Sequence, residues 1–135
     1  DLEEIYYQKE PYENKLPEVK NTKKINFGRL FGTRSGDKGG CANLGVWAKT
    51  PESYAFLYDF LTVERLKELL PDVSQYEVER HELPNILSLN FYIHDILQDG
   101  VSSSTRLDGQ AKSLGEYIRA KEIEAPDYLI EAIGG

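Results

Sequence analysis

Residues 43–71, NLGVWAKTPESYAFLYDFLTVERLKELLP, join a short strand pattern to two successive helical patterns. The first seven residues are typical of a β-strand. Thr50 and Pro51 predict a helix start, because a threonine side chain can accept a first-turn N–H and proline has no N–H to satisfy. Thr62 predicts a second start, and Pro71 ends that helix. Apolar residues recur at helical spacing after each start: Tyr54, Leu57, Tyr58 and Leu61, then Val63, Leu66, Leu69 and Leu70.

Strand patterns lie on both sides of these helices. Upstream, residues 24–34 (KINFGRLFGTR) alternate in the manner of one strand with interspersed glycines. Downstream, residues 75–84 (QYEVERHELP) predict a strand with one charged face. Residues 85–97 (NILSLNFYIHDIL) fit a strand or a helix, and we favour a strand because its second face is then uniformly polar: Ser88, Asn90, Tyr92 and His94. Asp108 predicts the start of a helix over 109–120, residues 121–126 a last strand, and residues 127–135 a terminal turn or helix.

This order of elements predicts an α+β fold of the ferredoxin-like type. One strand precedes a βαββαβ unit, which forms a four-stranded antiparallel sheet with two helices on one face. The other face of such a sheet must be polar or covered by a partner. Residues 1–24 show neither the helical nor the strand spacing of apolar residues, so they predict a linker or strap. We therefore expect one domain over residues 25–135.

Composition narrows the function classes. The 135 residues suffice for one core, and 40% hydrophobic and 29% charged residues are typical of a soluble globular protein. No apolar run approaches the roughly 20 residues of a membrane span and no signal peptide is evident, so we expect a cytoplasmic protein without a membrane partner. The net charge of −7 disfavours nucleic acid. One cysteine and two histidines predict no disulfide, and we expect no metal or other cofactor.

A glycine-rich motif, TRSGDKGGCAN, occupies residues 33–43. The glycines, Gly36, Gly39 and Gly40, can turn successive N–H groups toward one oxygen anion. The side chains suited to complete such a site are Arg34 and Lys38 as cations, Ser35 and Asn43 as neutral partners, and Asp37 as a base, ligand or turn residue. A long hairpin loop without a ligand uses the same residue types, so both interpretations stand. The motif is not a Walker A loop, since a strand follows it.

Four further residues are candidates for chemistry. His94 is the natural acid–base group of the open sheet face and Asn90 a ligand-binding neighbour, although a structural histidine is the simpler alternative. Cys41 lies near two cations, which favours a thiolate, yet a lone cysteine is more often a small buried residue and no histidine is near it in sequence. Arg106 precedes a helix start suited to an anion, a place for which Asp108 competes.

Three blocks together resemble a known family: residues 33–49 (TRSGDKGGCANLGVWAK), 79–97 (ERHELPNILSLNFYIHDIL) and 104–118 (STRLDGQAKSLGEYI). They are similar to the C-terminal domain of the acyclic terpene utilization AtuA family, over about Leu30 to Ile123. The resemblance implies a ferredoxin-like fold and a larger N-terminal domain, or separate subunit, as partner. It also implies a setting in acyl-CoA chemistry and the breakdown of acyclic terpenes and branched acids, without an established reaction.

The resemblance also assigns motif positions, and Cys41 departs from the family pattern. The matching positions are Arg34, Ser35, Gly36, Asp37, Lys38, Gly39, Asn43, Asn85, Asn90, His94, Arg106 and Asp108. The leading hypothesis is an accessory or assembly domain that docks by its open sheet face, onto the larger domain or onto an identical copy in a homo-oligomer. The alternative is an enzyme component whose glycine-rich loop binds a phosphate or carboxylate of an acyl-CoA-like substrate, with Asp37 or His94 transferring protons.

Overall fold

The computed structural model describes residues 12–38, 40–94 and 113–134. Its strands are β1 (Thr22–Asn26), β2 (Phe31–Lys38), β3 (Cys41–Ala48), β4 (Val78–Leu83), β5 (Ser88–Ile93) and β6 (Glu122–Pro126). Its helices are α2 (Phe27–Leu30), α3 (Pro51–Phe60), α4 (Val63–Leu69), α7 (Leu114–Arg119) and α8 (Asp127–Ala132), with 3-10 turns η1 (Pro71–Val73) and η2 (Pro84–Ile86).

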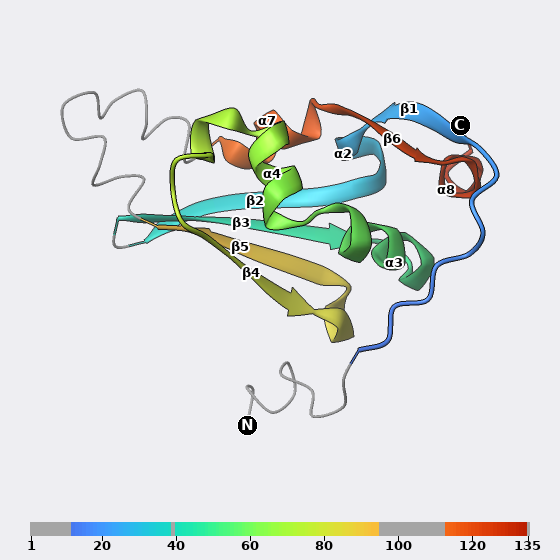
Figure 1. Cartoon of the computed structure of the whole chain (residues 1–135), viewed down its shortest axis with the longest axis horizontal. Coiled ribbons are helices and arrows are strands. Elements are labelled where there is room, and N and C mark those ends of the chain that lie inside the picture. Colours follow the sequence, from blue (N-terminus) through green and yellow to red (C-terminus); the bar gives the residue numbers. More distant parts are fainter. Residues whose placement is uncertain (1–11, 39, 95–112, 135) are drawn as a thin grey trace.

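Two antiparallel sheets form the framework (Figure 1). The larger sheet has the strand order β2-β3-β5-β4, and the smaller pairs β1 with β6. The buried side chains of β3 and β5 form one core with those of α3, α4 and α7, so these helices cover one face of the larger sheet. The expected α+β fold of ferredoxin-like type is therefore confirmed.

The last strand differs from the expected ferredoxin-like pattern. β6 pairs with β1 from Thr22↔Pro126 to Asn26↔Glu122 and does not join the larger sheet. β2 takes the edge position beside β3 instead. Both ends of the domain thus meet in the small sheet, at the upper right of Figure 1.

The prediction of one strand over residues 24–34 is wrong, because the turn of helix α2 interrupts it. Phe27 and Leu30 are both buried at helical spacing, and the N–H of Phe27 donates to the carbonyl of Lys121 at 2.8 Å. A Cβ at Gly28 would lie 3.0 Å from Cβ of Arg119, so glycine permits the close approach of α2 and α7.

The two predicted helix starts are confirmed. The hydroxyl of Thr50 accepts from the N–H of Ser53 at 3.1 Å, and that of Thr62 accepts from the N–H of Arg65 at 3.0 Å. Residues 61 and 62 separate the two helices at the expected bend. The strand interpretation of residues 85–97 is confirmed for β5, while residues 95–112, with the predicted start at Asp108, lie outside the described residues.

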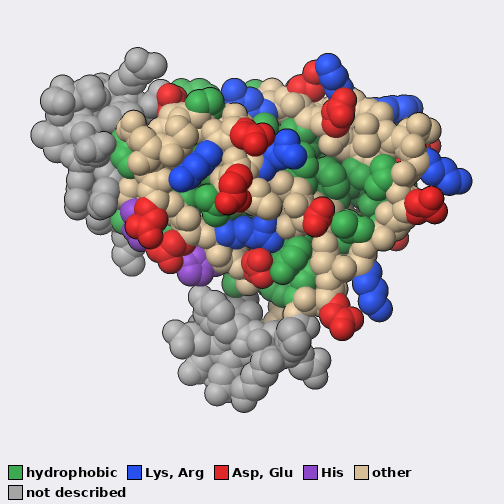
Figure 2. Space-filling model, in the orientation of Figure 1, with side chains coloured by type: hydrophobic (Ala, Val, Ile, Leu, Met, Phe, Trp, Pro, Cys, Tyr) green, Lys and Arg blue, Asp and Glu red, His purple; other side chains and the backbone are tan. Residues whose placement is uncertain are grey.

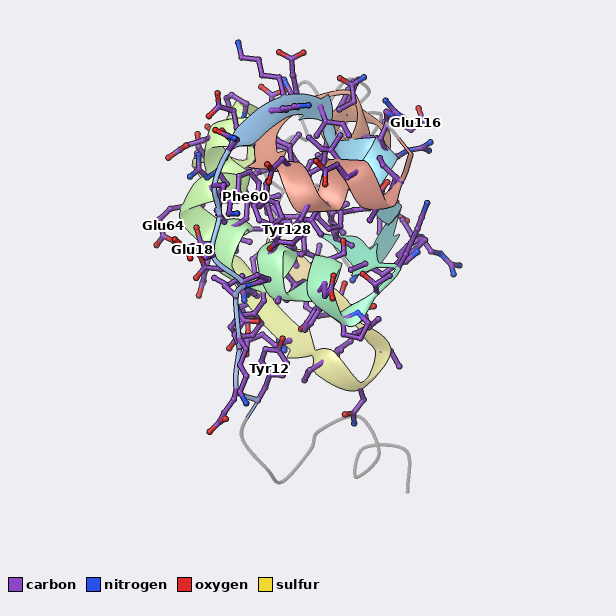
Figure 3. The ribbon with its side chains drawn as sticks, turned by 90° about the vertical axis from the view of Figure 1, so that its right-hand side faces the viewer. Tyr12, Glu18, Phe60, Glu64, Glu116 and Tyr128 are labelled. Atoms are coloured by element: carbon purple, nitrogen blue, oxygen red, sulfur yellow. The ribbon has the colours of Figure 1, made fainter. Side chains whose placement is uncertain are left out.

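An extended segment, residues 12–21, leads past α3 to β1 (Figure 3). The ring of Tyr12 contacts the rings of Tyr54 and Tyr58 on α3, with centroids 5.5 and 4.8 Å apart. Asn14 donates to the carbonyl of Ala55 at 3.0 Å. Tyr12 and Asn14 therefore pack on helix α3. Among the described helices, none has both the length and the apolarity needed to cross a membrane.

Candidate functional site on the open sheet face

The face of the larger sheet that points away from the helices carries most of the predicted site residues. Side chains of β3 and β5 alternate between buried positions and half-buried or exposed ones. Residues opposite one another in a ladder share a face. The open face therefore comprises Gly32, Arg34 and Gly36 of β2, Cys41, Asn43, Gly45 and Trp47 of β3, Ser88, Asn90 and Tyr92 of β5, and Glu79, His81 and Leu83 of β4. Lys38 of β2 pairs with Cys41 in the ladder.

The prediction of a long hairpin loop over residues 33–43 is wrong. β2 and β3 stay paired from Phe31↔Ala48 to Lys38↔Cys41, which leaves two residues between the strands. Gly40 has φ = 87°, a left-handed conformation that glycine adopts without strain. Gly36 lies in extended strand, where successive N–H groups point in opposite directions, so its amide does not belong to a concave nest. Gly39 lies outside the described residues.

The strand divides the motif residues between two faces. Arg34 is exposed on the open face opposite Gly45, whereas Ser35 and Asp37 fall on the helix side opposite Leu44 and Ala42. The two predicted proton-transfer residues, Asp37 and His94, therefore lie on opposite faces of the sheet.

Ser35 and Thr33 hold helix α7. The hydroxyl of Ser35 accepts from the N–H of Gly115 at 2.7 Å, and the hydroxyl of Thr33 donates to the carbonyl of Gly115 at 3.0 Å. Gly115 lies in the first turn of α7, whose N–H groups have no partner within the helix, and Ser113 makes no capping bond there. Ser35 thus caps α7 from a neighbouring strand.

A shallow hollow of about 200 Å³ lies at the middle of the open face. Arg34, Asn43, Trp47 and Asn90 are among its lining residues. The amide of Asn43 donates to Oδ1 of Asn90 at 2.6 Å, which ties β3 to β5 beside the hollow. Gly45 leaves the floor open, since a Cβ there would meet nothing closer than 3.8 Å.

Exposed apolar side chains lie at the hollow, which Trp47 and Ile86 line, and beside it, where Tyr92 pairs with Asn43. Trp47 is 40% exposed and Tyr92 39%, and Ile86 of η2 is 48% exposed. The indole of Trp47 lies across Gly32, where a Cβ would stand 2.1 to 2.4 Å from three ring atoms. The absence of a side chain at residue 32 therefore leaves the space that the indole occupies.

Ionisable groups gather at the end of the open face where β3 begins. Sγ of Cys41 lies 3.8 Å from Nδ1 of His94, and Nε2 of His94 contacts Oε2 of Glu79. Oε1 of Glu79 lies 3.6 Å from Nε2 of His81, whose ring meets the edge of Tyr92 at 5.2 Å between centroids. Figure 2 shows both histidines beside acidic side chains.

Sequence reasoning missed Glu79 and His81 as members of the site. The alternation in residues 75–84 did predict that both share one charged face, but only the pairing of β4 with β5 places that face beside His94. The predicted ligand residue Arg106 lies outside the described residues. In the part of the chain that the structure describes, no three His, Cys, Asp or Glu side chains are grouped to hold a metal ion.

These features define an α+β domain of ferredoxin-like type with an open, partly aromatic sheet face. The model of the AtuA ferredoxin-like domain family matches residues 25–124, and the chain belongs to this family. The resemblance seen in the three sequence blocks is thereby confirmed. No curated protein and no solved structure matches the chain.

Proposed function

We propose that this domain is an accessory or assembly domain of an AtuA-like protein in acyl-CoA, acyclic terpenoid or branched-acid catabolism, and that it docks through its open sheet face. The observation that carries the proposal is the placement of Trp47 and Tyr92, two half-exposed aromatic side chains, on central strands of a face that the described helices leave open.

Aromatic side chains of this kind supply much of the energy of protein interfaces. Trp and Tyr are enriched among the residues whose truncation weakens binding most, because each buries a large rigid surface and keeps a polar group. Here Arg34 and the Asn43–Asn90 pair lie beside them as a polar border. An aromatic centre with a polar border is the usual make-up of a docking surface.

The occupant that fits best is the larger AtuA-type domain. The family description names a domain of AtuA, which supports a partner elsewhere in the same protein or complex. A second copy of this chain fits less well, because each copy carries a net charge of −7 and two copies repel at long range. Exposed Arg34 on the docking face suits an acidic patch on the partner.

The test is a binding measurement between this chain and the larger AtuA-type polypeptide. We expect Trp47→Ala to raise the dissociation constant at least about tenfold, which corresponds to a loss of about 1.4 kcal/mol of binding free energy. Tyr117→Ala is the matched control, since Tyr117 is 48% exposed on helix α7, away from the open face. Equal effects of both variants, or none, would contradict docking through this face.

The oligomeric state separates the two occupants. Sedimentation of the isolated chain is expected to show only the monomer at several concentrations. If the chain self-associates and Trp47→Ala abolishes that association, the occupant is a second copy and the assignment to the larger domain is wrong.

The alternative function is anion binding in an enzyme component, which one observation favours. The hollow of about 200 Å³ has Arg34 at its border and two amide side chains in its wall. Titration with coenzyme A tests this function. Loss of coenzyme A binding in the Arg34→Ala, Lys38→Ala double variant, with docking retained, would support it, whereas loss of docking alone supports the assembly role.

A further inference from the structure

The chain of contacts Cys41–His94–Glu79 draws on three adjacent strands. The pairing Ala42↔Ile93 places Cys41 beside His94, and the pairing Glu79↔Tyr92 places Glu79 diagonally across from His94 on the same face. The N–H of His94 donates to the carbonyl of Glu77 at 2.9 Å, which extends the β4–β5 ladder to this residue. Strand backbone therefore holds all three side chains in register.

The contacts set the tautomer of the imidazole. Nε2 faces the carboxylate of Glu79, which only accepts hydrogen bonds and so requires the proton on Nε2. Nδ1 then presents its lone pair to the thiol of Cys41, 3.8 Å away. A nucleophile, a base within reach and a third group that orients the base are the parts that nucleophilic catalysis requires.

The site is open to a reactant. Cys41 and His94 are half-buried, and the side chain of His94 is 33% exposed. The hollow is lined by Asn43, which lies two residues from Cys41 along β3 and on the same face. A buried structural cysteine would offer no such access.

We propose that Cys41 is a nucleophile that accepts an acyl group from thioesters or other activated esters, with His94 as its base and Glu79 as the residue that positions His94. This inference goes beyond the docking role and does not rest on it.

The reaction balances with water as the only co-reactant. Sγ of Cys41 attacks the carbonyl carbon of R–CO–SR′ while Nδ1 of His94 takes the thiol proton. The C–S bond to the leaving thiolate breaks, the thiolate receives that proton, and Cys41 carries the acyl group. Water then attacks the acyl-cysteine with His94 again as base, which releases the carboxylic acid and restores the thiol.

Other charged groups face the same end of the sheet and affect the pH dependence. From β4 these are Glu79 itself and His81, whose Nε2 lies 3.6 Å from Glu79. Glu77, just before β4, stands opposite His94, since its carbonyl accepts from the N–H of His94. On β2, Lys38 occupies the register position opposite Cys41. Glu116 is exposed on helix α7, away from the open face, so it provides a control carboxylate.

The first test needs no variant and no docking partner. The native chain and the urea-unfolded chain are treated with iodoacetamide from about pH 6 to 8, and alkylation of Cys41 is followed by mass spectrometry. A free thiol ionises near pH 8.5, so it reacts slowly at the acid end of this range. We expect the native chain to react at least about tenfold faster there than the unfolded chain. A native rate equal to or below the unfolded rate would overturn the proposal.

The second test measures acyl transfer with a small acetyl thioester. We expect acetylation of Cys41, located by peptide mapping, and slow release of acetate. His94→Gln should slow acetylation at least about tenfold and shift its rise with pH upward by roughly one unit, while Glu116→Gln, at an exposed position of helix α7, leaves both unchanged. Glu79→Gln should slow it less, with partial rescue by Glu79→Asp. Circular dichroism checks that each variant is folded. Acetylation in folded His94→Gln at the rate of the unchanged chain would overturn the proposal.

Discussion

Substitution of Ser35 by alanine separates a structural role for the motif from a ligand-binding one. The change removes the 2.7 Å hydrogen bond from the N–H of Gly115, which is buried at the first turn of α7. An unsatisfied buried N–H costs about 1–3 kcal/mol. Because Ser35 is only half-buried, water can replace part of the bond, and we expect a loss of about 1–2 kcal/mol. For a chain of this length that lowers the melting temperature by about 4–8 °C.

Urea unfolding followed by circular dichroism measures this loss. The urea midpoint should fall for Ser35→Ala. The dependence of the unfolding free energy on urea should not change, since both chains expose the same surface on unfolding. Gly36→Ala is the neighbouring control, because a Cβ there meets nothing within 4 Å, and it should stay within about 0.5 kcal/mol of the unchanged chain. If Ser35→Ala kept its stability but lost coenzyme A binding, the capping role would be wrong and Ser35 would belong to a ligand site.

Two further predictions concern Trp47 and Tyr54. Gly32→Ala places a Cβ within 2.4 Å of the indole of Trp47, the only tryptophan in the chain. We therefore expect the ring to move outward and the fluorescence maximum to shift to longer wavelength. An unchanged spectrum would contradict the observed packing. Burial raises the pKa of Tyr54 above its ordinary value of 10, so the unfolded chain loses this proton first and stability falls as pH rises above about 10. Urea midpoints from about pH 8 to 11 test this. Tyr54→Phe should make stability fall less steeply with pH. It should also cost about 1 kcal/mol at neutral pH, because the 3.1 Å hydrogen bond to the carbonyl of Ser88 is lost. An equally steep decline in that variant would refute the reasoning.

Local features of the fold could be predicted from the sequence because their physics acts over a few residues. Thr50 and Thr62 bond to N–H groups three positions along, so the caps of α3 and α4 are visible in the chain itself. Alternation along residues 75–84 likewise predicted a charged face for β4, since successive strand side chains point to opposite sides. The order of these elements was enough for the fold class.

The sequence did not correctly predict which of two strands takes the edge position beside β3. The expected fold placed the last strand beside β3, whereas β2 takes that edge position and β6 pairs with β1, a strand about 100 residues earlier in the chain. Helix α2 interrupts a strand pattern because Gly28 allows it to approach Arg119 closely, a contact between residues distant in sequence. The hairpin at Gly40 is tight because the strands pair to their ends.

The sequence by itself determined the fold class, the helix starts and the polar character of one strand face, because hydrogen bonds to near neighbours and side-chain alternation encode them. Only the tertiary structure decided that β2 continues through the motif to Lys38, which places Arg34 and Ser35 on opposite faces of the sheet. It also brought Cys41 to His94, 53 residues away, through the shared ladder of β3 and β5. Strand register is a property of paired segments, and no single segment carries it.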